Sequence, residues 1–496
     1  MCIAKLYFLR IITNSGWENM KKFVVDLNGK KVDFPHYFEK CVGSCHAATA
    51  LREDWRVQIK KVKDAIGFKY VRFHGLLNDD MSVCSKHNGF FVYSFFNIDS
   101  IFDYLLSIDM KPFVELSFMP EVLASGTKTV FHYKGNITPP KKYEEWGDLI
   151  EALAKHLIER YGIEEVEKWY FEVWNEPNLK DFWSGTKDEY FQLYKTTANA
   201  IKRVNNNLKV GGPVTACNAW IADLIDFCNA ENVPLDFIST HHYPTDEALG
   251  HGLNMEEALA KSPRGITKSM CEKARKEAGS YPLFYTEWNS SPSCRDSYHD
   301  DPFAAAFVVK SVFDNAGLVD IYSFWTFSDI FEELPFPSTP FHGGFGLLNI
   351  HGIPKPTFRA FELLHRAGDK LITVNQEKNS LVELSAVIDD KKLMLFIYNH
   401  NMPLNPIDDE EVRIEIKGLD GWKFAYAERI DENHANPKKE WIEMGSPEYL
   451  NQDMINKLID KSKLEKEYVE ISNEEDKKVI KLFQPKHGVT AITIEF

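Results

Sequence analysis

The chain has 496 residues, of which 44 % are hydrophobic and 26 % are charged. This length can bury one large domain and a smaller one, and the composition is that of an ordinary globular protein. Lys and Arg total 58 against 73 Asp and Glu, so the formal net charge is −15. This charge argues against a nucleic-acid partner and against an anionic membrane partner.

The N-terminal stretch MCIAKLYFLRII is interrupted by Lys5 and Arg10, and it is too short to span a membrane. The eight cysteines form no CxxC pair, which is typical of free thiols in a reducing compartment. We therefore expect a cytoplasmic protein without a membrane partner. Met20 is followed by two lysines and makes a natural start, so residues 1–20 are expected to be an N-terminal extension.

Residues 21–40 carry two short strand-like pieces, and from Cys41 strand-like and helix-like segments alternate in eight units. The expected strands are KCVGS, KYVRFHG, KPFVELSFMP, WYFEVWNEP, KVGGPVT, FISTHHYP, PLFYTEW and IYSFWTF. The expected helices cover residues 52–66, 98–108, 146–161, 219–230, 255–278, 302–316 and 358–367. Because parallel strands need crossover helices, the alternation predicts an α/β fold, a (β/α)₈ TIM barrel over residues 41–370.

After the barrel the pattern changes to strands alone. The segments are LVELSAVI, KLMLFIYNH, EVRIEIKG, KFAYAERI and TAITIEF. Several of them alternate between apolar and polar residues, as a sheet with one solvated face does. We predict an accessory β-sandwich over residues 371–496, joined by the strands of residues 21–40. The charged stretch 451–478 is expected to be a solvated helix and loop.

Two predicted barrel strands end on a glutamate. The apolar strand WYFEV is followed by Trp174, Asn175, Glu176 and Pro177, and the strand PLFYTEW places Glu287. Active sites of such barrels form where the strands end. A pair of carboxylates held there is what acid/base hydrolysis of a glycosidic bond requires.

Other polar residues stand at the same ends of neighbouring strands. Arg72 and His74 close the second strand, and Trp325 at the end of the eighth is a flat apolar platform of the kind that sugar-binding clefts use. In HHY after the sixth strand, alternate residues share a face, so His241 and Tyr243 point the same way. These side chains are therefore expected to surround the two glutamates.

A metal site is the competing interpretation of the histidines after the sixth strand. His241, His242 and Asp246 offer ligand atoms, but their spacing fits no zinc motif. We expect no metal and no cofactor.

The motifs VWNEPNLKDFW, TEWN, FWTFSDIFEE and FHGGFG resemble glycoside hydrolase family 39 of clan A, the family of β-xylosidases and α-L-iduronidases. The resemblance runs from about Cys41 to Ala367. It implies a retaining mechanism with Glu176 as acid/base and Glu287 as nucleophile. The substrate-binding residues that it implies are Asn175 on the sugar 2-hydroxyl, His74, His241, Trp325 and the pair Glu332 and Glu333 around the terminal sugar, and Phe118 as an apolar wall; Tyr243 joins them through its strand face.

The roles of the two glutamates also follow from their chemistry. Glu176 must be protonated when the bond breaks, whereas Glu287 must be ionised, and Arg72 is the counter-charge expected to lower the pKa of Glu287. For a retaining enzyme we expect the two carboxyl groups to lie about 5–5.5 Å apart.

The segments RFHGLLNDD and TPPKKYEEWGDLIEA are similar to bacterial β-xylosidases, whereas HYPTD after the sixth strand departs from their pattern. We predict an exo-acting β-xylosidase on short xylo-oligosaccharides. Bulky Phe331 or Leu334 is expected to fill the space of the C5 hydroxymethyl that a pentose lacks.

Several alternatives stay open at this point. The same fold and mechanism serve β-glucosidases, α-L-arabinofuranosidases and α-L-iduronidases. A catalytically inactive sugar-binding barrel should have lost one glutamate, and both are present. A phosphate-handling aldolase needs a Schiff-base lysine and a glycine-rich loop, for which Gly343-Gly344 is the only candidate. The expected partner is an oligosaccharide or glycoside, and a homo-oligomer is left open.

Overall fold

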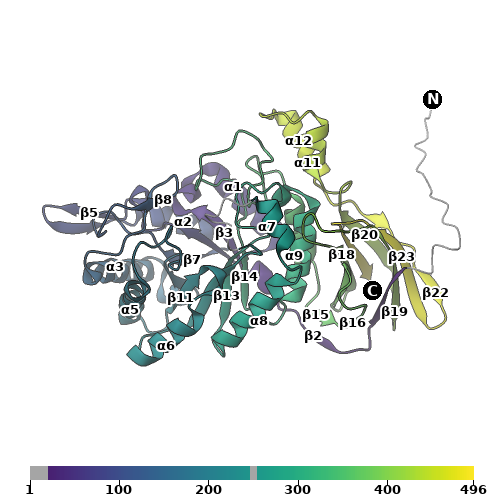
Figure 1. Ribbon diagram of the computed structural model, residues 1–496, viewed down its shortest axis with the longest axis horizontal. Helices are drawn as coiled ribbons and strands as arrows, with labels where there is room; N and C mark the ends of the chain where they lie inside the picture. The colour runs from purple at the N-terminus through teal and green to yellow at the C-terminus, as the bar shows by residue number, and fades with distance from the viewer. Residues whose placement is uncertain (1–19, 246–253) are drawn as a thin grey trace.

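The computed structural model describes residues 20–245 and 254–496, and these ranges form a barrel with two β-sheets packed beside it (Figure 1). The predicted N-terminal extension, apart from Met20, lies outside the described residues, as does Asp246. None of the helices in the described ranges has the length and apolar run that crossing a bilayer needs.

The predicted (β/α)₈ barrel is confirmed. Its eight strands close into one parallel ring in the order β10-β11-β12-β13-β14-β3-β4-β7. In chain order they are β3 (Cys41–His46), β4 (Tyr70–His74), β7 (Lys111–Leu116), β10 (Tyr170–Val173), β11 (Lys209–Thr215), β12 (Phe237–His242), β13 (Leu283–Trp288) and β14 (Ile321–Phe324).

Helices cover the outside of the barrel. They are α1 (Glu53–Ile66), α2 (Phe96–Ser107), α3 (Tyr143–Tyr161), α4 (Ile163–Val166), α5 (Lys187–Val204), α6 (Ile221–Glu231), α7 (Met255–Lys261), α8 (Ile266–Ala278), α9 (Pro302–Asp314) and α10 (Pro356–His365). The single helix predicted over residues 255–278 is wrong, because the chain forms α7 and α8 there. Pro263 lies between them, and proline has no N–H for a helix interior.

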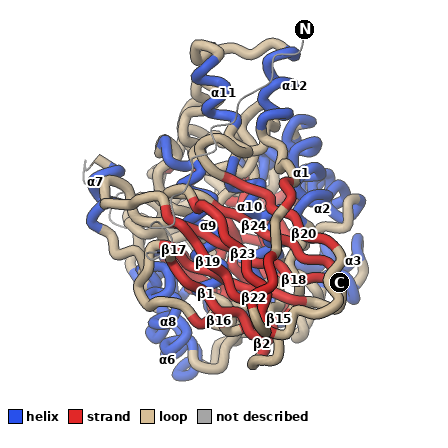
Figure 2. The backbone as a smooth tube through the Cα atoms, turned by 90° about the vertical axis from the view of Figure 1, so that its right-hand side faces the viewer, coloured by secondary structure: helices blue, strands red, loops and turns tan. Residues whose placement is uncertain are grey.

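The two sheets beside the barrel confirm the predicted β-rich accessory region (Figure 2). One sheet has the order β16-β1-β19-β23-β22 and the other β2-β15-β17-β18-β24-β20-β21. Their strands are β1 (Lys21–Asp26), β2 (Lys31–Asp33), β15 (Lys370–Ile372), β16 (Val374–Asn375), β17 (Val382–Ile388), β18 (Lys392–Asn399), β19 (Glu410–Lys417), β20 (Phe424–Ile430), β21 (Glu467–Tyr468), β22 (Ser472–Glu474), β23 (Lys477–Gln484) and β24 (Val489–Glu495).

Strands from both ends of the chain meet in these sheets. β1 pairs in parallel with β19, and β2 pairs antiparallel with β15. A separate apolar cluster that includes Phe23, Leu395 and Ile414 fills the space between the sheets. On this pairing we propose the division given by the sequence, with the barrel over residues 41–370 and the sandwich formed by residues 21–40 and 371–496.

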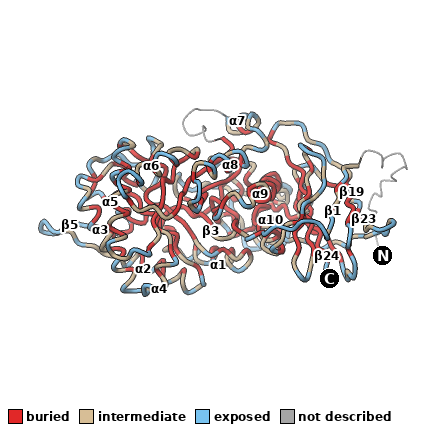
Figure 3. Tube along the Cα trace, turned by 90° about the horizontal axis from the view of Figure 1, so that it is seen from below, coloured by how far each residue is buried: buried red, intermediate tan, exposed pale blue. Residues whose placement is uncertain are grey.

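Helix α9 joins the two parts. It is apolar along almost its whole length and buried from Pro302 to Phe313, which is expected of a helix covered on both sides. It packs against α8 and α10 of the barrel and against β18 and β24 of the sheets. Figure 3 shows the buried residues running without a break from the barrel into the sheets.

The stretch 451–478, expected to be only helix and loop, contains more structure. Its helix is α12 (Gln452–Lys461), which packs on α11 (Pro437–Glu443), and the pair projects beyond the sheets (Figure 1). The rest supplies β21, β22 and the start of β23. Strand β23 buries Val479 and Ile480, whereas its lysines are partly or fully exposed. Because of these lysines the segment looked like a solvated loop in the sequence.

Two hairpins lie between barrel strands and their helices. The first pairs β5 (Cys84–His87) with β6 (Phe90–Tyr93), and the second pairs β8 (Thr129–Val130) with β9 (Gly135–Asn136). The second matters for the site, because its tip carries Phe131 over the mouth of the barrel.

Candidate active site

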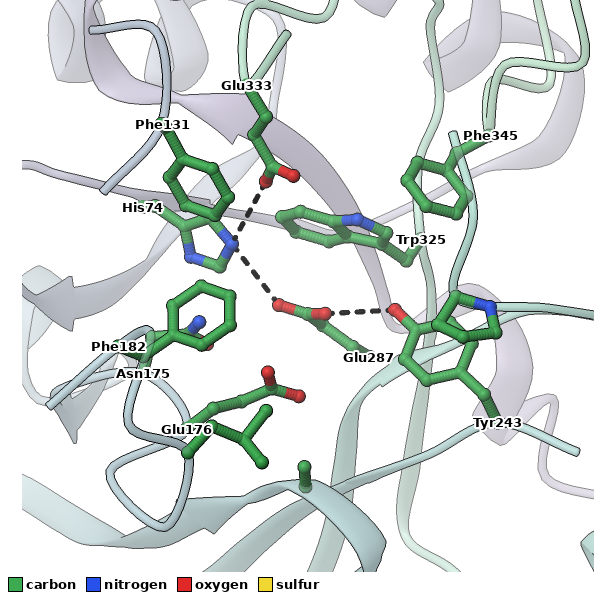
Figure 4. Close-up of a pocket in the computed structure, with 13 residues that line it drawn as sticks. His74, Phe131, Asn175, Glu176, Phe182, Tyr243, Glu287, Trp325, Glu333 and Phe345 are labelled. Atoms are coloured by element: carbon green, nitrogen blue, oxygen red, sulfur yellow. Dashed lines mark hydrogen bonds and ion pairs between the residues drawn. The ribbon is translucent and has the colours of Figure 1, made fainter. Parts of the chain in front are cut away.

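A pocket opens at the end of the barrel where the strands finish, as Figure 4 shows. The empty space inside it, part of which is open to solvent, is about 530 Å³. The lining residues are His74, Phe131, Asn175, Glu176, Leu179, Phe182, Ala216, Tyr243, Glu287, Pro292, Trp325, Glu333 and Phe345. Both predicted glutamates therefore face one cavity.

The turn after β10 presents Asn175 and Glu176. Trp174 and Glu176 both have positive φ, 76° and 45°, which is uncommon for side-chain-bearing residues and reverses the chain direction sharply. The Glu176 N–H donates to the carbonyl oxygen of Val214 at 2.9 Å, and Pro177 cannot continue the strand. This backbone fixes the glutamate at the rim.

Glu287 reaches the centre of the barrel because β13 is irregular. The pairing of β13 with both β12 and β14 shifts register next to this residue. In a regular strand neighbouring residues face opposite sides, yet here Thr286 bonds Glu172 and Glu287 bonds Arg72. The shift turns two successive side chains of β13 toward the barrel interior.

The two pocket glutamates lie close together. One carboxylate oxygen of Glu176 and one of Glu287 are within 4.8 Å of each other, with a ring nitrogen of His241 within the same distance. Inverting glycosidases keep their carboxyl groups roughly 6.5–9.5 Å apart to admit a water, whereas retaining ones hold them about 5–5.5 Å apart. The observed spacing matches that of retaining glycosidases, in which one carboxylate attacks the anomeric carbon directly.

Arg72 is the cation at the centre of the site and is completely buried. Its guanidinium contacts Glu172 at 2.5 Å, Glu115 at 2.8 Å and Glu287 at 2.8 Å, and it donates to the side-chain oxygen of Asn175 at 2.9 Å. A buried charge persists only when it is paired and hydrogen-bonded. These carboxylates hold the pKa of Arg72 above its ordinary value, so Arg72 is charged throughout.

Glu287 has three polar neighbours, of which Arg72 and Tyr243 favour its ionised form. Besides Arg72, the Tyr243 hydroxyl donates to Oε2 at 2.9 Å, and His74 Nε2 lies 3.4 Å from Oε1. Burial nevertheless raises the pKa of Glu287 overall, although Arg72 opposes it. The predicted lowering by Arg72 is thus present but outweighed, because the carboxyl group has lost its contact with bulk water.

One guanidinium cannot neutralise all the acids around it. Burial raises the pKa of Glu115 to about 7, and burial together with Glu287 and Glu115 raises that of Glu333 well above its usual range. Burial lowers the pKa of His74 to about 3, so this ring is neutral. Burial and the neighbouring acids therefore favour the protonated form of Glu333, while Arg72 and Tyr243 favour the carboxylate form of Glu287.

The structure separates the two glutamates that the sequence left equivalent. Glu333 lines the pocket 3.7 Å from His74 Nε2. Glu332 instead pairs with His46 at 2.9 Å and with Arg52 at 3.1 Å, and it is absent from the lining. Glu332 thus holds the loop after β14 against the barrel.

Phe118 is also absent from the lining, so the predicted apolar wall is made by other residues. Phe118 is fully buried behind His74 and packs edge-on against Trp174. The wall consists of Phe131, Phe182 and Phe345. Phe182 and Phe345 lie in the quoted motifs VWNEPNLKDFW and FHGGFG, whereas Phe131 lies in a polar loop with no sequence signal.

Trp325 lies flat against β3. A Cβ built on Gly43 would sit 2.3 Å from its indole ring, so only glycine admits the ring there. The His74 ring centroid is 4.7 Å away on the pocket side. Phe331 packs edge-on against Trp325 and Phe345; it supports the lining without joining it, and Leu334 is exposed.

The glycines of FHGGFG are used for close packing. A Cβ on Gly343, Gly344 or Gly346 would lie 2.3–2.4 Å from Asp296 or Asp329 atoms. The buried Lys355 bridges Asp300 at 2.6 Å and Asp329 at 2.7 Å, and these two aspartates accept the N–H groups of this loop. The N–H groups of Gly343 and Gly346 are thus occupied by protein carboxylates, which argues against a phosphate loop. The loop instead brings Phe345 into the pocket.

The chain is similar to known glycoside hydrolases over most of its length. The family model described as glycosyl hydrolases family 39 matches residues 21–477. A β-xylosidase of Caldicellulosiruptor saccharolyticus is 58% identical over 466 residues, covering 92% of this chain and 95% of the relative. A β-xylosidase of Geobacillus stearothermophilus is 38% identical and covers 88% of each chain. A crystal structure of a monomeric β-xylosidase from Caulobacter crescentus superimposes with a TM-score of 0.86 at 32% identity, covering 96% of this chain and 99% of that one.

Proposed function

The chain belongs to glycosyl hydrolase family 39, and from that premise we propose that it is a retaining β-xylosidase that removes terminal xylose from short xylo-oligosaccharides. As a member of this family it is a glycoside hydrolase. The observation that carries the mechanism is the pair of pocket carboxylates, Glu176 and Glu287, with oxygens within 4.8 Å. The large share of the chain matched by the two β-xylosidases supports the substrate class.

In the first step Glu287 attacks the anomeric carbon and forms a glycosyl ester while the bond to the leaving oxygen breaks. Glu176 gives its proton to that oxygen, so the leaving sugar departs as an alcohol. Arg72 and Tyr243 hold the attacking carboxylate through Oε1 and Oε2. Asn175, fixed by Arg72, lies where it can bond a ring hydroxyl of the sugar.

In the second step a water molecule replaces the departed sugar. Formation of the ester has removed the negative charge of Glu287, and Glu176 is now a carboxylate. Glu176 takes a proton from the water, whose oxygen bonds the anomeric carbon and releases Glu287. Two displacements leave the anomeric configuration unchanged, and both carboxyl groups return to their starting states.

The lining favours a neutral sugar over a uronic acid. Among the described residues that line the pocket there is no Lys or Arg, and the guanidinium beneath it, that of Arg72, is engaged by carboxylates and Asn175. A substrate carboxylate would therefore meet Glu176, Glu287 and Glu333 without a free cation. This argues against α-L-iduronidase activity.

We expect the enzyme to cleave an aryl β-xyloside with a kcat/KM at least about 10-fold above that for the aryl β-glucoside, the scale of a few lost contacts. Phe131, Phe182 and Phe345 wall the pocket, and we expect these rings to leave little room for the hydroxymethyl group of glucose. Steady-state kinetics on aryl glycosides of xylose, glucose, arabinose and iduronic acid measure this preference. Equal or better activity on the glucoside would remove the xylosidase assignment and leave the retaining mechanism intact.

Glu332 and Glu333 provide a matched pair of variants for the same assay. Glu333→Ala should lower kcat/KM on the xyloside by about 10-fold, the value of a hydrogen bond to a neutral group worth roughly 1 kcal/mol or slightly more. Glu332→Ala should change it little, since this carboxylate pairs with His46 and Arg52 outside the pocket. The reverse order of the two variants would contradict the assignment of Glu333 to the sugar.

A further inference from the structure

A continuous line of hydrogen bonds joins the two catalytic glutamates below the pocket floor. Starting at Glu176, its Oε1 lies 2.9 Å from His241 Nδ1, and His241 Nε2 lies 3.1 Å from the Thr286 hydroxyl. The Thr286 hydroxyl lies 2.8 Å from Glu172 Oε1. Glu172 Oε2 contacts Arg72, which in turn contacts Glu287. Every member of this line is buried.

The direction of the bonds follows from the acceptor at the far end. Burial raises the pKa of Glu172, but Arg72 at 2.5 Å from its Oε2 opposes this and favours the carboxylate, which can only accept hydrogen bonds. Thr286 has a single hydroxyl proton, which it gives to Glu172. The Thr286 oxygen must then accept a hydrogen bond from His241, which requires the imidazole proton to be on Nε2.

This proton position leaves His241 Nδ1 as an acceptor facing Glu176. The ring is neutral, because burial and the nearby Arg72 lower the pKa of His241 well below its ordinary value. At 2.9 Å, an unprotonated nitrogen and a carboxylate oxygen would repel one another. A proton on the Glu176 carboxyl group converts that repulsion into a hydrogen bond.

We infer that Thr286, anchored on Glu172, is a positioning residue that fixes the Nε2–H tautomer of His241, so that His241 Nδ1 holds the proton of Glu176 between turnovers. This inference rests on the proposed role of Glu176 as acid/base. It explains how Glu176 stays protonated in a site crowded with carboxylates. It also serves the second step, since the Nδ1 lone pair makes the ionised Glu176 a stronger base toward water.

Other charged and titratable groups also face His241 and Glu176 and contribute to the pKa values of these two side chains. They are Arg72 and His74 from β4, Glu172 from β10, Tyr243 after β12, and Glu287 from β13. Replacing Thr286 leaves all of these groups in place. A change in the titration of Glu176 would then come through the tautomer of His241.

The test is the pH profile of kcat/KM for an aryl β-xyloside with a poor leaving group, which requires the proton of Glu176. In Thr286→Val the anchor is lost at nearly constant volume, and His241 can carry its proton on Nδ1 and donate to the Glu176 carboxylate. Such a bond stabilises the ionised form and lowers the pKa of Glu176. The basic limb of the profile should therefore move down by about one pH unit, while activity below that limb stays near the wild-type value.

Thr286→Ser keeps the hydroxyl and should leave the basic limb where it is. If Thr286→Val does not fold, Thr286→Ala carries the same expected shift. A uniform loss of activity at every pH, with an unmoved limb, would mean that Thr286 acts only in packing and would overturn the inference. A limb that moves to higher pH would overturn it as well, because the tautomer would be the opposite one.

Glu176→Ala separates this inference from the proposed function. If Glu176 is the acid/base, this variant should lose the basic limb altogether. A basic limb that persists in Glu176→Ala would refute the proposed role of Glu176. A limb that vanishes in Glu176→Ala but does not move in Thr286→Val would refute only the role of Thr286.

Discussion

Glu287→Ala is expected to lower kcat on an aryl β-xyloside by roughly 10⁴-fold or more, because the variant has no nucleophile to form the glycosyl-enzyme. The methyl group also leaves space beside Arg72 and Tyr243 where the carboxylate stood. Azide can occupy that space and attack the anomeric carbon once. Turnover should return with azide, and the product should be the α-xylosyl azide, of inverted configuration.

Glu332→Ala is the matched control for this experiment, since it removes a glutamate at the same barrel end but outside the pocket lining. It should keep turnover and gain nothing from azide. Substantial activity of Glu287→Ala without azide would contradict the assignment of the nucleophile. A β-configured azide product from this variant would contradict it too.

Glu176→Ala should behave differently from the nucleophile variant. A substrate with a good leaving group needs little proton assistance, so formation of the glycosyl-enzyme should be nearly normal. Hydrolysis of that intermediate has lost its base, and kcat should fall by about 10²–10⁴-fold. We expect stopped-flow absorbance to show a rapid burst of released phenol followed by slow turnover.

Azide distinguishes the two variants once more. In Glu176→Ala it should attack the glycosyl-enzyme on the face where water normally enters, and give the β-xylosyl azide after two displacements. An aryl xyloside with a poor leaving group should be far less reactive with this variant, because the first step then lacks its acid. If Glu287→Ala gave the β-xylosyl azide and Glu176→Ala gave the α-xylosyl azide, the roles of Glu176 and Glu287 would have to be exchanged.

Much of the barrel could be predicted because each strand and helix carries its own signal. Parallel strands covered on both faces are continuous apolar runs, and β10 and β13 stand out for that reason. Glu176 lies three residues beyond the last residue of β10 and Glu287 is the next-to-last residue of β13, and both line the pocket as predicted. The break between α7 and α8 did have a signal, because Pro263 and Gly265 lie between them and a proline inside a helical pattern usually ends the helix.

The buried carboxylates around Arg72, those of Glu115 and Glu172, were not predicted, although the sequence contains a signal for them. Glu115 and Glu172 are charged residues inside otherwise apolar strands, at the alternate positions that share a face with Phe113 and Tyr170. A buried carboxylate needs a partner, and Arg72 on the neighbouring strand β4 is the obvious cation. Reading these positions as one layer would have predicted the surroundings of Glu287 from the sequence.

Loop residues were harder to assign for a physical reason. Glu332 and Glu333 are adjacent, and strand alternation cannot be applied to the irregular chain after β14. Which one faces the pocket depends on Arg52 and His46, residues far away in sequence that bind Glu332. Phe131 reaches the pocket through the β8–β9 hairpin, and each strand of this hairpin has only two residues.

The configuration of the first product formed by the native enzyme tests the central claim most directly. Proton NMR can follow hydrolysis of an aryl β-xyloside before mutarotation mixes the anomers. Two carboxylates within 4.8 Å, one attacking and one shuttling a proton, predict that β-xylose appears first and the α anomer only later. Initial release of α-xylose would demonstrate a single displacement by water and would contradict the mechanism.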